Sequence, residues 1–101
     1  MKAKKSLGQH FLKSKKVIAR IVEAAQVEAS DTILEVGPGK GVLTAALLAT
    51  GATVSAVEKE DDLIPFLQER FADELERGQL QLVHADVLEV DVASLIPGPF
   101  K

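Results

Sequence analysis

The sequence contains no cysteine, tryptophan or tyrosine, and phenylalanine, at four positions, is its only large aromatic residue. The absence of cysteine excludes disulfide bonds, thiolate metal sites and a cysteine nucleophile. No apolar run approaches the roughly 18 residues of a membrane-spanning helix. The basic N-terminus is not followed by the apolar stretch of a signal peptide. We therefore expect a cytoplasmic protein with no membrane segment and no metal site.

The composition is that of a globular protein, with 47% hydrophobic and 27% charged residues in a chain of 101. The net charge of −3 conceals an asymmetry, because residues 1–20 carry seven positive charges and no negative ones. A basic arm on an acidic body suggests a polyanionic partner such as RNA, and a solvated N-terminus is the alternative. The lysines expected to contact RNA phosphates are Lys2, Lys4, Lys5 and Lys13.

Hydrophobic periodicity predicts helices and strands that alternate along the chain. The expected elements are a helix over 17–25 capped by Ser14, a strand over 32–36, a helix over 42–50, a strand over 53–57 that ends at Glu58, a helix capped by Asp61 or Asp62 that ends at Gly78, a strand over 80–84 and a short helix or turn over 90–96. The residues of the third helix expected to point inward are Leu63, Phe66, Leu67, Phe71 and Leu75. This order predicts a parallel α/β fold, which binds ligands at the carboxyl ends of its strands.

A glycine-rich turn, Gly37-Pro38-Gly39-Lys40-Gly41, follows the first expected strand. Glycines in such a turn let the backbone approach a ligand closely, although tight turns also use glycine for packing. The spacing differs from the dinucleotide fingerprint G-x-G-x-x-G/A, because Val42 occupies its last position. The turn also lacks the G-K-[ST] ending of a P-loop. A nicotinamide or triphosphate site is therefore disfavoured.

Carboxylates end the second and third expected strands. Glu58 lies 21 residues after Gly37 and could accept hydrogen bonds from both hydroxyls of a ribose. Its alternative role is that of a solvated acidic residue before a helix N-terminus. Asp86 could accept a hydrogen bond from the exocyclic amine of an adenine, with Val87 lending a backbone N–H, or could be a loop aspartate. With the glycine turn, these residues predict a nucleoside-binding pocket.

Four segments together resemble the ribosomal RNA adenine N6,N6-dimethyltransferase family: residues 5–12 (KSLGQHFL), 34–44 (LEVGPGKGVLT), 57–58 (VE) and 84–88 (HADVL). Enzymes of this family use S-adenosyl-L-methionine to dimethylate adenines of small-subunit ribosomal RNA. The G-Q-[NH]-F-L segment distinguishes them from other methyltransferases. The erythromycin-resistance methylases, which act on large-subunit RNA, have a similar segment. The resemblance implies a partial Rossmann-like methyltransferase fold of three parallel strands with flanking helices and an N-terminal helix.

The resemblance also implies which residues bind the cofactor S-adenosyl-L-methionine. Those that would close over its methionine and ribose are Gln9, His10 and Leu12, and those beneath the methionine are Gly37 and Gly39. Glu58 would hold the ribose, and Asp86 with Val87 the adenine. Asparagine is commoner in the family where this chain has His10; a backbone contact would survive that change, and whether the side chain also contacts the cofactor is left open.

The family's catalytic motif, Asn-Leu-Pro-Tyr or a close variant, follows the fourth strand and does not occur in this sequence. We expect a basic arm over residues 1–13 and, over residues 14–101, the N-terminal half of a cofactor-binding domain, without the catalytic half or the C-terminal domain. The chain itself would then be inactive. Two alternatives remain: a non-catalytic cofactor-binding module, and the N-terminal part of an erythromycin-resistance methylase.

Without a fourth strand, the first strand of such a fold becomes an edge. Its residues 32–36 would expose unpaired N–H and C=O groups, with Glu35 as the only charged residue, and such an edge can pair with another chain. We therefore expect a homodimer or a larger assembly. The alternative is that residues 90–101 fold back and cover the edge within one chain.

Overall fold

The computed structural model describes residues 15–101. The elements in order are α2 (Lys15–Ala24), β1 (Thr32–Val36), α3 (Val42–Ala49), β2 (Thr53–Glu58), α4 (Leu63–Arg70), α5 (Ala72–Glu76), β3 (Leu80–His84), the 3-10 turn η1 (Val87–Glu89) and α6 (Val92–Leu95). All three strands lie where the sequence predicts them, and the expected cap at Ser14 lies outside the described residues.

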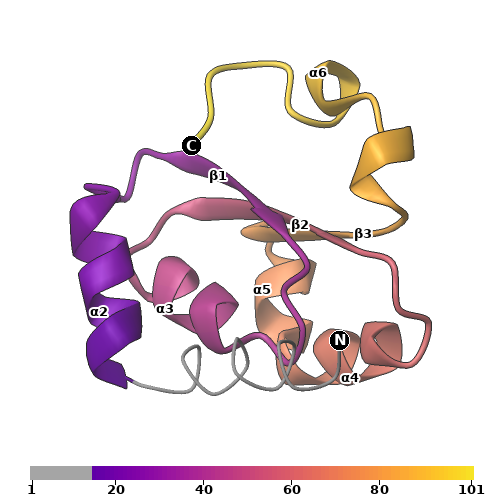
Figure 1. The fold of residues 1–101 in the computed structure, drawn as a ribbon, viewed down its shortest axis with the longest axis horizontal. Helices are drawn as coiled ribbons and strands as arrows, with labels where there is room; N and C mark the ends of the chain where they lie inside the picture. The colour runs from indigo at the N-terminus through magenta and orange to yellow at the C-terminus, as the bar shows by residue number, and fades with distance from the viewer. Residues whose placement is uncertain (1–14) are drawn as a thin grey trace.

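The three strands form one parallel sheet in the order β1-β2-β3 (Figure 1). Ile33 pairs with Val54 and Ala56 pairs with Leu82, so the strand ends are aligned across the sheet. Each strand is followed by a helix or helical turn, which is the α/β arrangement that the periodicity predicts. The carboxyl ends of all three strands therefore meet at one edge of the sheet.

The hydrophobic core lies between the sheet and helices α3, α4 and α5. The buried residues that form it are Ile33, Leu47, Leu48, Ala52, Val54, Ala56, Leu67, Phe71 and Leu80. Helix α2 packs beside α3 at one end of this layer (Figure 1). Segment η1–α6 and the C-terminal residues lie over the opposite face of the sheet, where Val57 and Ile96 are buried.

The third predicted helix is two helices, and three expectations about it are wrong. The chain breaks at Phe71, whose backbone (φ −114°, ψ 31°) leaves the helical range because its ring is buried against Gly41. Asp62 makes no side-chain cap, since its own backbone is helical rather than extended. Phe66 is 45% exposed, because Leu67 and Phe71 occupy the side of the helix that faces the core.

The outer edge of β1 is partly covered, which corrects the expectation that it is unpaired. The Lys101 N–H donates to the Thr32 carbonyl (2.8 Å), and the Leu34 N–H donates to the Lys101 carbonyl (2.7 Å). These two bonds place Lys101 beside Ile33 in the pattern of a parallel ladder. The folded-back C-terminus, proposed above as the alternative, thus covers this part of the edge.

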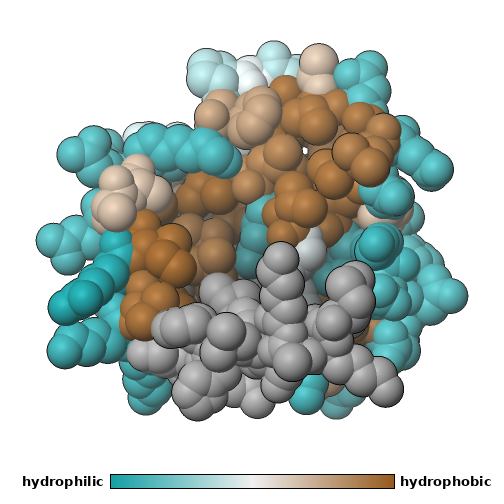
Figure 2. All heavy atoms as spheres, in the orientation of Figure 1, coloured by the Kyte–Doolittle hydropathy of each residue, from teal (hydrophilic) through white to brown (hydrophobic). Residues whose placement is uncertain are grey.

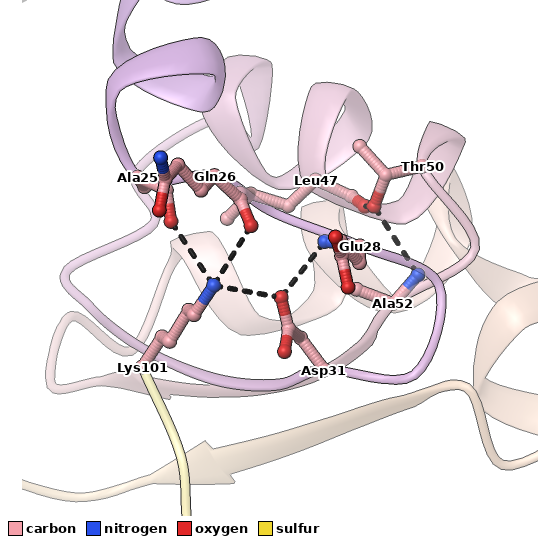
Figure 3. A network of polar contacts seen from close by, with 8 residues as sticks. All are labelled: Ala25, Gln26, Glu28, Asp31, Leu47, Thr50, Ala52 and Lys101. Carbon is pink, nitrogen blue, oxygen red and sulfur yellow. Dashed lines mark hydrogen bonds and ion pairs between the residues drawn. The ribbon is translucent and has the colours of Figure 1, made fainter.

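The Lys101 side chain joins the end of α2 to the start of β1 (Figure 3). Its ammonium donates to the carbonyls of Ala25 (3.1 Å) and Gln26 (2.8 Å) and pairs with Asp31 (3.0 Å). A cation at this position satisfies carbonyls that the helix end leaves free. The hydrogen bond from the Glu28 N–H lowers the pKa of the Asp31 carboxyl below its ordinary value, and the Lys101 ammonium lowers it further.

In the described part of the chain, no helix has the length and apolar character needed to cross a membrane.

Candidate functional site

The three strand ends border one pocket of about 690 Å³. Its walls are the glycine turn after β1, residues 58–60 after β2 and residues 85–88 after β3. Leu43 and Leu63 add apolar surface from helices α3 and α4. The structure thus brings together the predicted residues Gly37, Gly39, Glu58, Asp86 and Val87.

The glycines of the turn serve two different purposes. Gly39 has a positive φ of 59°, and a Cβ built on it meets nothing within 4 Å. Gly41, with φ 88°, would place a Cβ 2.5 Å and 2.8 Å from two ring atoms of Phe71. Gly39 therefore leaves open space beside the pocket, whereas Gly41 is required for packing of the turn on the core.

Glu58 is buried (4% exposed) and connects two walls of the pocket. Its Oε1 accepts a hydrogen bond from the Gly39 N–H (3.1 Å), and its Oε2 accepts one from the Glu60 N–H (2.9 Å). Each carboxylate oxygen can accept a second hydrogen bond. The side chain is thus fixed in position and retains acceptor capacity for a ligand in the pocket.

Asp86 caps the short turn η1. Its Oδ1 accepts a hydrogen bond from the Leu88 N–H (2.9 Å), which fixes the carboxylate at the end of β3. This bond also holds Val87 and Leu88 in the pocket wall. The position is consistent with an acceptor for an amino group on a ligand.

Glu35 is a pocket residue that the sequence patterns above do not indicate. It is 7% exposed and lines the pocket, and its Oε1 accepts a hydrogen bond from the Thr44 hydroxyl (2.5 Å) in the first turn of α3. Burial raises the pKa of the Glu35 carboxyl, an effect that Thr44 opposes and the charge of Glu58 reinforces. The available signal was a carboxylate inside an otherwise apolar strand.

Arg70 of α4 supports the glycine turn from outside the pocket. Its guanidinium donates to the Lys40 carbonyl (2.5 Å) and lies 5.2 Å from the centre of the Phe71 ring. The turn is thus held by Glu58 on one side and by Arg70 and Phe71 on the other.

Seven predicted site residues lie outside the described residues: Gln9, His10, Leu12, Lys2, Lys4, Lys5 and Lys13. Within residues 15–101, no group of three or more His, Cys, Asp or Glu side chains is arranged to hold a metal ion.

Two relatives with similar sequences match nearly the whole of this chain. "Ribosomal RNA small subunit methyltransferase A" of Caulobacter vibrioides is 50% identical over 97 residues, which are 96% of this chain and 37% of the relative. The same-named protein of Thermosynechococcus vestitus is 42% identical over 95 residues, 94% of this chain and 34% of the relative. The chain therefore spans little more than a third of the length of these relatives.

Solved structures share the fold. The crystal structure of the 23S rRNA methyltransferase ErmE has a TM-score of 0.68 and 32% identity, and the match covers 77% of this chain and 31% of that one. An RNA methyltransferase from Salinibacter ruber in complex with S-adenosyl-L-homocysteine has a TM-score of 0.70 and 23% identity, covering 80% and 54%. The second likeness supports the methyltransferase fold alone.

The family model described as ribosomal RNA adenine dimethylase matches residues 1–98. This match covers nearly the whole chain and includes the glycine turn, Glu58 and Asp86. The protein belongs to the ribosomal RNA adenine dimethylase family.

Proposed function

We propose that this chain is the S-adenosyl-L-methionine-binding part of an enzyme that dimethylates adenines of small-subunit ribosomal RNA at N6. The observation that carries the proposal is the convergence of the glycine turn, Glu58 and Asp86 on one pocket. Its family and the names of its relatives supply the reaction and the RNA class. Such an enzyme would work in the cytoplasm.

The residues of the pocket fit this cofactor. The open space beside Gly37 and Gly39 accommodates the methionine part close to the backbone. The spare acceptor capacity of Glu58 suits the ribose hydroxyls, and Asp86 with Val87 suits the adenine. When bound, the cofactor supplies a methyl group activated by its sulfonium, and the role of these residues is to bind and orient it.

The erythromycin-resistance type of methylase is the second candidate. The likeness to the 23S rRNA methyltransferase ErmE favours it, at 32% identity. The small-subunit relatives reach 50% identity over nearly the whole chain, so we prefer a small-subunit RNA substrate.

Calorimetric titration of the purified chain with S-adenosyl-L-methionine tests the proposal. We expect saturable binding that weakens about fivefold to tenfold in Asp86→Ala, which corresponds to about 1–1.4 kcal/mol for one hydrogen bond. Asp73→Ala, an exposed carboxylate on α5 outside the pocket, is the matched control and should bind normally. Absence of binding, or equal affinities for both variants, would place the pocket elsewhere.

We also propose that the basic arm over residues 1–13 contacts RNA. Binding of an RNA oligonucleotide should weaken steeply with salt and show little sequence preference, because lysines that neutralise phosphates release counterions. Deletion of residues 1–5, which removes Lys2, Lys4 and Lys5, should weaken RNA binding and leave cofactor binding nearly unchanged. Fluorescence anisotropy of a labelled RNA at several salt concentrations measures the RNA affinity of both chains, and calorimetry measures their cofactor binding. RNA affinity that does not change with salt would contradict the proposal.

Because the catalytic motif expected from the family does not occur in this sequence, we propose that the 101-residue chain binds the cofactor without transferring its methyl group. Incubation with small-subunit RNA and a cofactor carrying a labelled methyl group should leave the RNA unlabelled. Label in the RNA that depends on Glu58 would contradict this proposal.

We further propose that the chain self-associates through the free part of the β1 edge. Lys101 bonds to backbone groups of Thr32 and Leu34. Because the backbone groups of alternate residues in a strand face the same side, those of Val36 also face the outer edge, beyond Lys101. Val36, in this edge, and Phe100, which precedes Lys101, are 56% and 44% exposed and give the edge apolar character. Figure 2 shows brown surface in the upper part of the view, where Figure 1 draws η1 and α6.

Sedimentation at increasing concentration should therefore show a dimer or larger species. Phe100→Glu should shift the equilibrium to monomer, since a charge on an edge opposes pairing. A monomer that persists at high concentration would show instead that Lys101 covers enough of the edge by itself.

A further inference from the structure

Thr44 is a buried polar residue of helix α3. It lies in the first turn of α3, is 1% exposed and is close in sequence to the core residues Leu47 and Leu48. A hydroxyl removed from water this completely needs a partner. Among the described residues, its partner is Oε1 of Glu35, nine residues earlier on β1.

The two carboxylate oxygens of Glu35 differ in their hydrogen bonds. Oε1 is held by Thr44, whereas no hydrogen bond to Oε2 occurs among the described residues. Among those residues, every fully buried side-chain oxygen has a hydrogen-bond partner. Oε2 has none, so it is not fully buried and contacts open space. Because Glu35 lines the pocket, that open space belongs to the pocket.

We propose that Thr44 is a positioning residue of the candidate site, whose hydroxyl fixes the Glu35 carboxylate so that Oε2 faces the pocket as an ionised acceptor for a cationic or hydrogen-donating group of the ligand. The inference rests on the proposed function for the identity of the ligand, which carries an ammonium and a sulfonium. The arrangement of Thr44 and Glu35 is independent of that identity.

The charges around Glu35 explain why the hydroxyl is needed. Burial is the main effect that opposes ionisation of Glu35 and raises its pKa, and the neighbouring carboxylate of Glu58 on β2 adds to it. Helix α3, which packs against β1, has no ionisable side chain. The other charged residues that line the pocket are Lys40, Lys59, Glu60 and Asp86. Thr44 is thus the group that donates a hydrogen bond to the ionised form, and its loss should raise the pKa of Glu35.

The first measurement needs no ligand. The carboxyl carbon of Glu35, observed by NMR during a pH titration of the free protein, should titrate at a higher pH in Thr44→Val than in the unmodified chain. Thr44→Ser, which keeps the hydroxyl, should restore the original titration. Thr44→Ala removes the hydroxyl with a smaller side chain and replaces the valine variant if that variant does not fold. Equal titration in all folded variants would overturn the inference, whatever the outcome for ligand binding.

The second measurement uses S-adenosyl-L-methionine. Because a protonated Glu35 cannot balance a cation, affinity in Thr44→Val should begin to fall at a higher pH than in the unmodified chain as the pH is lowered, while that of Thr44→Ser follows the unmodified chain. Adding Thr44→Val to Glu35→Gln should cause no further change in this pH profile. An unmodified chain that binds nothing would refute the proposed function, and binding with identical pH profiles in the threonine and valine forms would refute the role of Thr44.

Discussion

Replacement of Gly41 by alanine should destabilise the protein by about 2–5 kcal/mol. An L-residue at positive φ costs about 1–2 kcal/mol, and overpacking of a core adds about 1–3 kcal/mol. Here φ is 88° and the new Cβ would lie 2.5 Å from the ring of Phe71, so both costs apply. Since a domain of this size is stable by only about 5–15 kcal/mol, urea denaturation should show a large loss.

Two other glycines provide matched controls for this substitution. Gly78 also has a positive φ (77°) with nothing within 4 Å of a built Cβ, so Gly78→Ala should carry only the conformational cost of about 1–2 kcal/mol. Gly39→Ala should show the same modest loss of stability but a weaker affinity for the cofactor, because its Cβ enters the open space beside the pocket. Equal stabilities for the Gly41 and Gly78 variants would mean that the Phe71 ring moves freely.

Glu58→Ala should reduce affinity for S-adenosyl-L-methionine by about tenfold to a hundredfold, the equivalent of about 1–3 kcal/mol. The substitution removes an acceptor from the ligand and also from the N–H groups of Gly39 and Glu60. The glycine turn and the loop after β2 would therefore lose the side chain that joins them. We expect a loss of thermal stability together with the loss of affinity.

Calorimetry on Glu58→Ala and on Glu76→Ala separates these effects from the removal of a negative charge. Glu76 is exposed on α5 and does not line the pocket, so its variant should bind normally. Glu58→Gln should also bind poorly, because its amide nitrogen cannot accept a hydrogen bond from a backbone N–H. Affinity within about twofold of the unmodified chain in Glu58→Ala would show that the ribose is held elsewhere.

The local features of the fold could be predicted because they depend on neighbours in the sequence. Apolar alternation and turn residues placed β1, β2 and β3 within one residue of their observed bounds. Gly51 and Gly78 end helices in the left-handed conformation, as glycine-terminated helices commonly do. The parallel order of strands then placed the glycine turn, Glu58 and Asp86 at one edge of the sheet.

Other features depend on contacts between residues distant in the sequence, and only the tertiary structure shows them. The break at Phe71 follows from its ring packing on Gly41, thirty residues earlier, which overrides a continuous helical pattern. The hydrogen bond from Thr44 to Glu35 crosses from a helix to a strand, so the sequence presents the two residues as unrelated.

Lys101 illustrates the same limit at the end of the chain, where its backbone pairs with β1 and its side chain reaches α2. The sequence by itself determined the α/β class, the three strands and the carboxylates at their ends, because periodicity and turn chemistry act over a few residues. Tertiary structure decided which glycine packs and which leaves space, how Glu35 enters the pocket and how the edge of β1 is covered. Those outcomes depend on side chains that meet only after the sheet and its helices have packed together.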